Sequence, residues 1–369
     1  MKRITFLILI ILSVAGSAAH AQKKLWADRL IATNEYMQKH LWNAASGNFV
    51  RRADQQNSPG SDAWGITIVL DAYAYMIEDG LMKPEDLKRY YTSSSAIYEK
   101  TNGTHGNRIL ARQGDQIYVG GDDDMQWCAA LVHCYTATKD SEYLNAAKFA
   151  FNGLIALGFW KDGKQDASGA QGWSWNSNDR RPNGVSTAYG ALSAARLFKV
   201  TGDIVYKQWA FASLAALTTP QVGFFPRDMM VAADAALTIY DVTKQEDYRA
   251  MAEKLYGAAT ISAFSKADAI PNYNPTDVGD LADGMAHFAV INPKDAHAKT
   301  MAMQPINTFL HDRSNKDIAE HGFYSKYDTK GHPLLTAGGS YLGVPLNVPY
   351  LPEVAEMLKL FAIAYKNSQ

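Results

Sequence analysis

Apolar positions recur with helical spacing along most of the chain, and few runs show the two-residue alternation that is typical of strands. Helices that are apolar on most faces are predicted at residues 62–78, 122–137, 183–200, 228–242, 279–291 and 346–366. More amphipathic helices are predicted at residues 26–41, 84–99, 141–157, 204–217, 246–263 and 294–313. Because the two kinds alternate along the chain, the pattern predicts inner helices that are each paired with an outer one.

Three helix-to-helix junctions repeat one motif. Each has a threonine, a tyrosine five residues later and an alanine four residues beyond it: Thr138, Tyr143 and Ala147; Thr201, Tyr206 and Ala210; Thr243, Tyr248 and Ala252. A tyrosine and an alanine at this spacing share one face of the second helix. Repeated helical hairpins build solenoids or closed rings. We therefore expect an all-α fold, an (α/α)6 barrel of six hairpins, with an open superhelical solenoid as the alternative.

The first 21 residues have the features of a secretory signal peptide. Two basic residues, at positions 2–3, precede an apolar run at residues 4–15, and the small-x-small sequence Ala19-His20-Ala21 follows. The apolar run is short for a membrane-spanning anchor helix, which is the alternative. We expect cleavage after Ala21, leaving a single domain of residues 22–369 that is periplasmic or secreted and is not bound to a membrane.

Charge and cysteine content exclude several classes of protein. The 369 residues include 36 Lys and Arg and 37 Asp and Glu, so the chain lacks the basic excess of a dedicated nucleic-acid binder. Two cysteines are too few for a disulfide framework or a four-ligand zinc site. Cys128 and Cys134 are six residues apart in a predicted helix, so they lie on different faces and should not bond to each other. We expect no metal or other cofactor, and a monomer.

Polar residues gather at the predicted starts of the inner helices. In such a barrel the inner helices run parallel, so their N-termini open on one face of the molecule. The residues concerned are Asp62, Asp122, Asp123, Asp124, Asn183, Arg227, Asp228, Asp280, Asp283 and Asn347. Each alone is explained as an N-cap or a first-turn acid, whereas together they would line one acidic cleft.

The strongest candidate for chemistry is the run Asp122-Asp123-Asp124 at the start of a buried helix. One aspartate suffices as a cap. The helix dipole and its N–H groups can keep one or two carboxylates ionised, while repulsion and burial raise the pKa of the other. An ionised carboxylate beside a protonated one is what retaining glycoside hydrolysis uses. A calcium site and an inert cap are the alternatives, although the run lacks the alternating ligands of a calcium loop.

Aromatic residues near these acids are suited to sugar rings. Asp124 and Trp127 share a helix face, which predicts an aromatic platform beside the acid. Trp173 and Trp175 alternate in a polar loop, where they suit stacking on the apolar faces of sugars. Asn183, at the start of the next inner helix, is able to hydrogen-bond hydroxyl groups. The alternative is that the loop tryptophans are tucked under the rim of the barrel.

These motifs resemble glycoside hydrolase family 76, the bacterial and fungal endo-α-1,6-mannanases. The matching pieces are Asp123-Asp124-Met125-Gln126-Trp127, the loop Gly172-Trp173-Ser174-Trp175, and Asn183-Gly184 with the helix and turn that follow. They lie within residues 120–215, and Asp62-Ala63-Trp64 is a weaker upstream match.

The resemblance implies an (α/α)6 barrel that cleaves an α-mannan polysaccharide or oligosaccharide by a retaining mechanism, without a cofactor. Asp123, aligned with the family's first aspartate, would be the nucleophile, and Asp124 the acid/base. The third aspartate leaves a one-residue ambiguity, in which the pair is Asp122 and Asp123. The other residues expected to bind substrate are Asp62, Asp122, Trp127, Trp173, Trp175, Asn183, Arg227 and Asp228.

One segment departs from the family's pattern. Family members usually carry Tyr-Asn-Gln-Gly at the start of the next inner helix, where this chain has Gly223-Phe224-Phe225-Pro226-Arg227-Asp228. The cleft therefore differs on this side. The alternative functions are an unsaturated-glycuronyl hydrolase, whose uronate would pair with Arg180, Arg181 or Arg227, and a non-catalytic carbohydrate-binding barrel.

Overall fold

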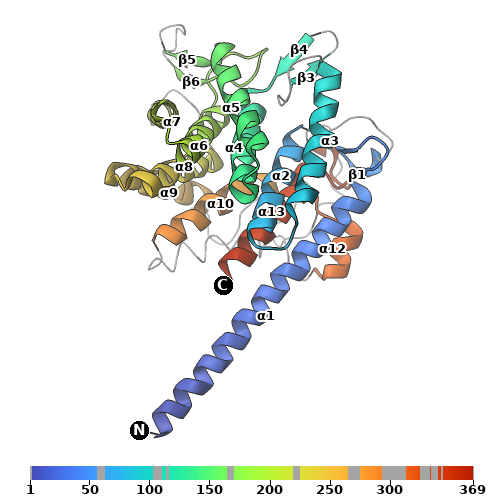
Figure 1. Ribbon diagram of the computed structural model, residues 1–369, viewed down its shortest axis with the longest axis vertical. Helices are drawn as coiled ribbons and strands as arrows, with labels where there is room; N and C mark the ends of the chain where they lie inside the picture. The colour runs from blue at the N-terminus through green and yellow to red at the C-terminus, as the bar shows by residue number, and fades with distance from the viewer. Residues whose placement is uncertain are drawn as a thin grey trace.

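The protein is built from alternating inner and outer helices (Figure 1). The computed structural model describes residues 2–55, 63–102, 110–113, 116–163, 170–218, 225–264, 275–292, 313–324, 333, 340–341 and 344–368. The inner helices are α2 (Ala63–Glu78), α4 (Gly121–Thr138), α6 (Gly184–Thr201), α8 (Pro226–Thr243), α10 (Pro275–Ile291) and α13 (Leu351–Asn367). The outer helices are α1 (Lys2–His40), α3 (Pro84–Asn102), α5 (Ser141–Ala156), α7 (Ile204–Leu217) and α9 (Glu246–Phe264), and the short α12 (Asn315–His321) packs on α1.

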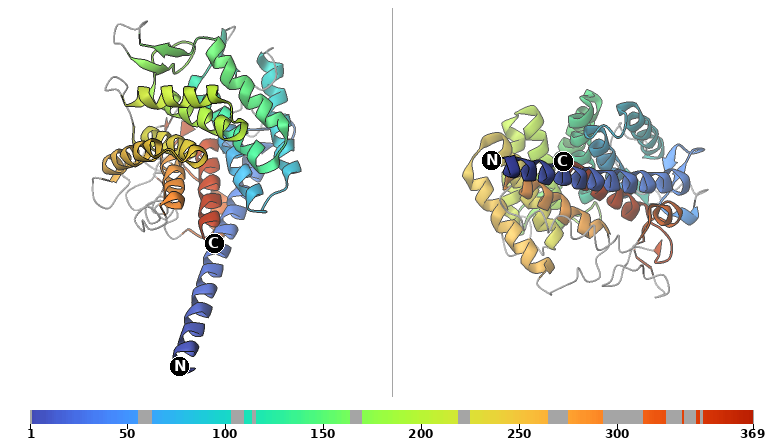
Figure 2. Two further views of the ribbon diagram at one scale, coloured as in Figure 1. Left: turned by 60° about the vertical axis from the view of Figure 1, so that its left-hand side comes forward. Right: turned by 90° about the horizontal axis from the view of Figure 1, so that it is seen from below.

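The inner helices form a closed ring. Each packs against the next in sequence, from α2 through α4, α6, α8 and α10 to α13, and α13 packs back against α2. Helices α3, α5, α7 and α9 each pack on the inner helix that precedes them, and α1 packs on α13 (Figure 2). The closed ring confirms the (α/α)6 barrel and excludes the open solenoid. The outer helix predicted at residues 294–313 lies almost wholly outside the described residues.

The repeated motif is a turn that its threonine fixes. The Thr138 hydroxyl donates to the carbonyl four residues earlier, 2.7 Å away, and accepts from the backbone N–H of Asp140. Between them, Lys139 has a φ of 63° and ends α4. Thr201 and Thr243 make the same two hydrogen bonds, and the tyrosine and alanine that follow each threonine are buried. The predicted buried face of the outer helices is confirmed.

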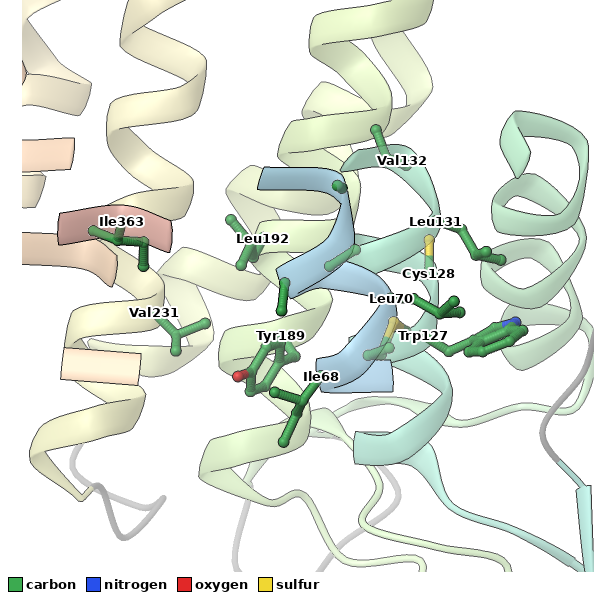
Figure 3. Close-up of a cluster of buried hydrophobic side chains, with 14 of the residues drawn as sticks. Ile68, Leu70, Trp127, Cys128, Leu131, Val132, Tyr189, Leu192, Val231 and Ile363 are labelled. Carbon is green, nitrogen blue, oxygen red and sulfur yellow. The ribbon is translucent and has the colours of Figure 1, made fainter. Parts of the chain in front are cut away.

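The core lies between and within the two layers of helices. Figure 3 shows part of it, where Leu70, Cys128 and Leu131 are completely buried. Helices α2 and α13 approach closely, because a Cβ atom added to Gly65 would lie 2.7 Å from the Leu351 Cγ atom. Cys134 is buried as well, and both cysteines are free thiols, as the sequence predicted.

Among the described residues, short hairpins precede several inner helices. They pair β1 (Trp42–Asn43) with β2 (Asn48–Phe49), β3 (Leu110–Gln113) with β4 (Gln116–Val119), β5 (Trp160–Asp162) with β6 (Gln171–Trp173), and β7 (Ser340–Tyr341) with β8 (Val344–Pro345). A single 3-10 turn, η1 (Ala53–Gln55), follows β2. Strands of this length are too short for two-residue alternation to reveal them in the sequence. They surround the N-terminal end of the ring, since each lies in the connection into an inner helix.

Helix α1 is one continuous helix whose first half stands away from the barrel (Figures 1 and 2). Its second half packs on α13 and buries Trp26, Leu30, Tyr36 and Met37. In the part of the chain that the structure describes, no helix combines the length and the apolar character needed to cross a membrane.

Candidate active site

Glycines bring the start of α4 against the tryptophan loop. The Gly121 N–H donates to the Trp175 carbonyl oxygen at 2.6 Å, and Gly120 forms an antiparallel bridge with Asn176. A Cβ atom added to Gly121 would lie 2.2 Å from the Ser174 carbonyl oxygen, so only glycine permits this approach. The two strongest sequence signals, the aspartate run and the tryptophan loop, therefore meet at one end of the ring.

A side-chain hydrogen bond joins these two signals. The Trp175 Nε1–H donates to the Asp122 Oδ2 atom at 3.1 Å, while 44% of Trp175 stays exposed. Burial raises the pKa of the Asp122 carboxyl, although backbone N–H groups, the Trp175 N–H and the Arg227 charge oppose this rise. Asp122 therefore anchors an exposed indole ring at the N-terminal end of the inner helices, which we call the mouth of the barrel.

The three consecutive aspartates differ in orientation, because successive residues of a helix are rotated by about 100°. Asp122 shares a face with Gln126, which lines the inside of the barrel. Asp124 is only 1% exposed and lies close enough to the Cys128 thiol for its charge to raise the pKa of that group. Asp123 lies between the two and is partly exposed.

Arg227 and Asp228 begin the inner helix α8 on the other side of the mouth. The Asp228 Oδ2 atom accepts from the backbone N–H of Phe225 at 3.2 Å, and its Oδ1 atom lies 3.4 Å from the Arg227 Nε atom. Burial raises the pKa of Asp228 to about 6, with Arg227 opposing the rise and Asp280 adding to it. Arg227 thus lies within electrostatic reach of both Asp122 and Asp228.

Two predicted sugar platforms are wrong. Trp127 and Trp173 are each 1% exposed and face the core. Trp127 stacks on Tyr91 of α3, with ring centroids 6.0 Å apart, and the Trp173 Nε1–H donates to the Ser213 hydroxyl at 2.9 Å. Trp127, one helical turn after Asp124, is turned toward the outer helix α3. Trp173 is the last residue of β6 and is buried, whereas Trp175 lies beyond the end of the strand and is 44% exposed.

The other polar residues of the tryptophan loop have structural roles. The Asn183 side chain accepts a backbone N–H from the first turn of α6, as a helix cap does. Arg181 pairs with Asp179 at 2.6 Å on the surface, and its side chain is 81% exposed. The Arg180 guanidinium lies 4.1 Å from the centroid of the Phe159 ring.

Asp280 and Asp283 lie inside the barrel, not at the start of a helix. Helix α10 begins at Pro275, a turn earlier than predicted, which moves both carboxylates inward. Asp280 accepts a hydrogen bond from the Tyr189 hydroxyl at 2.6 Å, and Asp283 accepts one from the Tyr75 hydroxyl at 2.7 Å.

Two further residues, Asp62 and Asn347, were predicted to lie at the mouth. Asp62 lies outside the described residues. Asn347 is exposed in the turn before α13, which begins at Leu351 and not at residue 346. Within the described ranges, no group of three or more His, Cys, Asp or Glu side chains is arranged to hold a metal ion.

A buried ionic cluster beneath the mouth was not predicted. The Lys359 Nζ atom lies 2.8 Å from the Glu356 Oε1 atom and 3.7 Å from the Asp280 Oδ1 atom. Burial raises the pKa of Glu356 to about 8, with Lys359 opposing the rise. A Cβ atom added to Gly279 would lie 1.8 Å from the Glu356 Oε1 atom. The sequence signal that could have revealed this cluster is the presence of charged residues within the otherwise apolar helix α13.

Comparison with known proteins shows the fold through structure alone. A scan against protein-family models finds no match, and a search of curated protein sequences finds none either. Among solved structures, the GH76A α-1,6-mannanase from Salegentibacter sp. HEL1_6 is similar with a TM-score of 0.70 and 13% identity, over 93% of this chain and 100% of that one. The GH76 α-mannanase BT2949 from Bacteroides thetaiotaomicron is similar with a TM-score of 0.71 and 17% identity, over 94% and 96%.

The fold is therefore that of the glycoside hydrolase family 76 structures. The same fold also occurs with another activity, since a D-mannose isomerase is similar with a TM-score of 0.66 and 11% identity, over 93% of this chain and 97% of that one. The Salegentibacter enzyme has also been solved with α-1,6-mannotriose as an inactive variant, in which two consecutive aspartates are replaced by asparagine.

Proposed function

We propose that this protein is an exported glycoside hydrolase that cleaves α-1,6-mannan internally with retention of configuration. The observation that carries the proposal is the run Asp122-Asp123-Asp124 at the N-terminal end of the ring, beside the exposed Trp175. The shared fold supports it, because a relative in that fold becomes inactive when two consecutive aspartates are replaced.

Asp123 is the nucleophile of the proposed reaction. Retaining enzymes have two carboxyl groups about 5–5.5 Å apart, and neighbouring residues of one helix turn can reach this separation. The Asp123 carboxylate attacks the anomeric carbon while the second carboxyl protonates the leaving oxygen. A water molecule, deprotonated by that second group, then hydrolyses the glycosyl ester and regenerates both carboxyl groups.

Asp124 is the proposed acid/base, because aligning Met125-Gln126-Trp127 with the family motif makes Asp123 and Asp124 its two aspartates. Asp124 is 1% exposed, so its carboxyl is shielded from bulk water. Side chains of a helix lean toward its N-terminus, so a first-turn carboxyl leans toward the mouth. Asp122 instead accepts an N–H from Trp175 and lies within reach of the Arg227 charge, so we assign it to positioning the substrate.

Substrate recognition is proposed at the rim around these aspartates. The exposed ring of Trp175 offers an apolar surface for a sugar. Arg227 and Asp228 are placed to hydrogen-bond hydroxyl groups. The close pairing of Arg227 with Asp228 leaves its charge compensated, which favours a neutral sugar over the uronate of a glycuronyl hydrolase.

The proposed export rests on the N-terminal segment. The part of α1 that stands away from the barrel contains the predicted signal peptide, so removing residues 1–21 leaves the packing of α1 on α13 intact. N-terminal sequencing of the protein recovered from the periplasm or medium should begin at Gln22. Recovery of the full-length chain in the cytoplasm alone would contradict export.

Product analysis tests the proposed reaction. Wild-type protein should release oligosaccharides from debranched α-1,6-mannan, with the α-anomer formed first in the NMR spectrum. Asp123→Asn should release none, and its thermal unfolding should match the wild type. The same samples are assayed for mannose isomerisation and for activity on unsaturated uronides. Isomerisation without hydrolysis, or binding without any turnover, would replace the proposed function by the corresponding alternative.

A further inference from the structure

A cavity opens at the end of the barrel opposite to the aspartate run. Its volume is about 310 Å3, near the lower end of the roughly 300–1,000 Å3 that small-molecule sites occupy. Its lining comes from the C-terminal halves of the inner helices. Along α4, the distance from Asp122 to His133 is about 16 Å at the helical rise. The cavity reaches the surface at Val290, which is 66% exposed.

Each histidine of this cavity bridges two carboxylates on a neighbouring inner helix. The His133 Nδ1 atom lies 2.7 Å from the Asp71 Oδ1 atom, and its Nε2 atom lies 3.3 Å from the Glu78 Oε1 atom. Burial disfavours the charged imidazole, but the two carboxylates outweigh burial and raise the pKa of His133. The two carboxylates therefore favour the charged form of His133, whose contacts tie α4 to α2.

The same arrangement recurs on the far side of the ring. His287, on α10, contacts Asp234 with its Nδ1 atom and Asp241 with its Nε2 atom, the latter at 3.2 Å. Asp234 and Asp241 are seven residues apart on α8, as Asp71 and Glu78 are on α2. Helices α8 and α10 lie three hairpins beyond α2 and α4 in a ring of six. The first set, His133 with Asp71 and Glu78, therefore faces the second set, His287 with Asp234 and Asp241, across the barrel axis.

A lysine completes each set at the surface. The Lys366 Nζ atom lies 2.6 Å from the Glu78 Oε2 atom, and the Lys199 Nζ atom lies 3.3 Å from the Asp241 Oδ2 atom. Both lysine side chains are about half exposed, at 45% and 47%. The outer ammonium groups are thus accessible to a ligand that enters the cavity.

Arg196 joins the two sets at the bottom of the cavity. Its guanidinium lies 3.6 Å from Asp71, 3.6 Å from Asp234 and 3.8 Å from Asp283. With both imidazoles protonated, the network has as many cationic as anionic groups: His133, Arg196, Lys199, His287 and Lys366 against Asp71, Glu78, Asp234, Asp241 and Asp283. A charged ligand would lose its hydration without meeting a net opposite charge, whereas a neutral polar ligand meets paired donors and acceptors.

Apolar side chains lie between the charged groups. Val132, Val200 and Ile363 contribute to the lining, together with the Tyr75 ring and the Thr238 side chain. A sugar or other cyclic polyol presents hydroxyl groups around its edge and C–H groups on its faces, which matches a wall of mixed charged and apolar groups.

We propose that this cavity is a binding site for a neutral polyhydroxylated compound of one or two rings. Carboxylates such as Glu78 and Asp241 accept hydrogen bonds from hydroxyl groups, and the Lys199 and Lys366 ammonium groups donate hydrogen bonds to hydroxyl oxygens. The site goes beyond the proposed hydrolysis and does not depend on it, since it lies at the other end of the barrel and uses none of the α4 aspartates.

Calorimetric titration of the full chain tests the proposal with four probes. Methyl α-mannoside and myo-inositol are the neutral polyols, inorganic phosphate is the anion, and putrescine is the cation. Val290→Trp adds an indole at the rim of the cavity, and Val242→Trp, at a position 45% exposed that does not line the cavity, is its matched control. A Lys199→Met/Lys366→Met variant removes the donors without adding bulk. Trp175→Ala reports binding at the opposite mouth.

The expected result is binding of at least one polyol that is weakened about tenfold or more by Val290→Trp and by the double lysine variant, and is unchanged by Val242→Trp and Trp175→Ala. Loss in Trp175→Ala alone would place the polyol at the candidate active site and overturn the proposal. Tighter binding of phosphate or putrescine than of both polyols, or no binding by any probe, would overturn it too. Circular dichroism checks the fold of each variant, and the double lysine variant decides if Val290→Trp unfolds.

Discussion

The two ends of the barrel are built from the same helices but arrange their charges differently. At the N-terminal end, Asp122 and Asp228 lie within electrostatic reach of Arg227, and Asp123 and Asp124 follow Asp122 in the first turn of α4, so carboxylates outnumber cations among these five residues. At the C-terminal end, each carboxylate that lines the cavity has a cationic partner within 4.0 Å, provided by His133, Arg196, Lys199, His287 and Lys366.

This difference separates charges that stabilise the ring from charges that do not. Balanced pairs at the C-terminal end tie each inner helix to its neighbour and offset the cost of burying charge. The aspartates at the N-terminal end have one cation, Arg227, shown within reach of two of them, so the cost of burying their charge is less fully offset. Uncompensated charge at one end of the helices, with compensated charge at the other, is the pattern expected if the first end is the functional one.

The largest expected effect comes from the acid/base of the N-terminal end. Asp124→Asn should lower kcat/KM on α-1,6-mannan by about 10²–10⁴-fold, the usual contribution of general acid–base catalysis. Asp122→Asn keeps an acceptor for the Trp175 N–H and should cost about tenfold or less, since it changes positioning alone. Steady-state kinetics on purified variants measures both. If Asp122→Asn is the more damaging variant, the catalytic pair is Asp122 and Asp123, and Asp124 is structural.

A large loss of stability is expected at the opposite end. Arg196→Met leaves Asp71, Asp234 and Asp283 facing one another without the guanidinium, and it should lower the free energy of unfolding by about 3–5 kcal/mol. Lys199→Met removes a half-exposed partner of Asp241 and should cost about 0–1 kcal/mol. Urea unfolding monitored by circular dichroism compares them. Equal losses in the two variants would refute the claim that the buried network ties the ring.

The two ends should also lose stability in different pH ranges. At the C-terminal end, Asp234 and Asp241 raise the pKa of His287 to about 9 against the effect of burial. The stability from this raised pKa is present below the unfolded value of about 6.5 and is lost as pH rises through 9, on the order of 3 kcal/mol. At the N-terminal end, burial raises the pKa of Asp228 to about 6, above the unfolded value of about 3.9. The stability from this raised pKa is present below about pH 4 and is lost as pH rises through 6.

Variants assign these pH ranges to single residues. His287→Gln should flatten the stability profile between pH 6.5 and 9.5, and Asp228→Asn should flatten it between about pH 4 and 6. Each variant serves as the control for the other, because neither substitution touches the other's partners. The measurement is the difference in unfolding free energy from wild type at each pH. Parallel profiles for wild type and His287→Gln above pH 6.5 would show that His287 is not the group that titrates.

Sequence alone predicted the ring of helices well, and it predicted part of the site. Apolar spacing and the threonine motif define the hairpins, because both depend on residues within one or two turns of each other. The aspartate run and Trp175 were placed together correctly at the mouth. Trp127 and Trp173 were not, since their burial depends on where an outer helix and a strand pack, which local spacing does not encode.

The C-terminal cavity escaped prediction for a related reason. Its ion pairs join residues far apart in sequence, such as His133 and Asp71, which are 62 positions apart. Each helix contributes only isolated charged residues within an apolar run. Isolated charged residues form no motif that can be recognised in the sequence. Only closing the ring brings His133, His287 and Arg196 around one space.

The smallest expected effect concerns the tryptophan at the N-terminal mouth. Trp175→Ala removes both the exposed ring and the N–H that Asp122 accepts, and should raise KM for α-1,6-mannan about fivefold, near the energy of one aromatic contact. Trp175→Phe keeps a ring and loses the N–H. If the ring binds sugar, Trp175→Phe should recover most of the KM while Trp175→Ala does not; if anchoring of Asp122 matters instead, both variants should lower kcat alike. An unchanged KM in both variants would remove Trp175 from the substrate site, leaving the exposed indole as a rim residue held in place by Asp122.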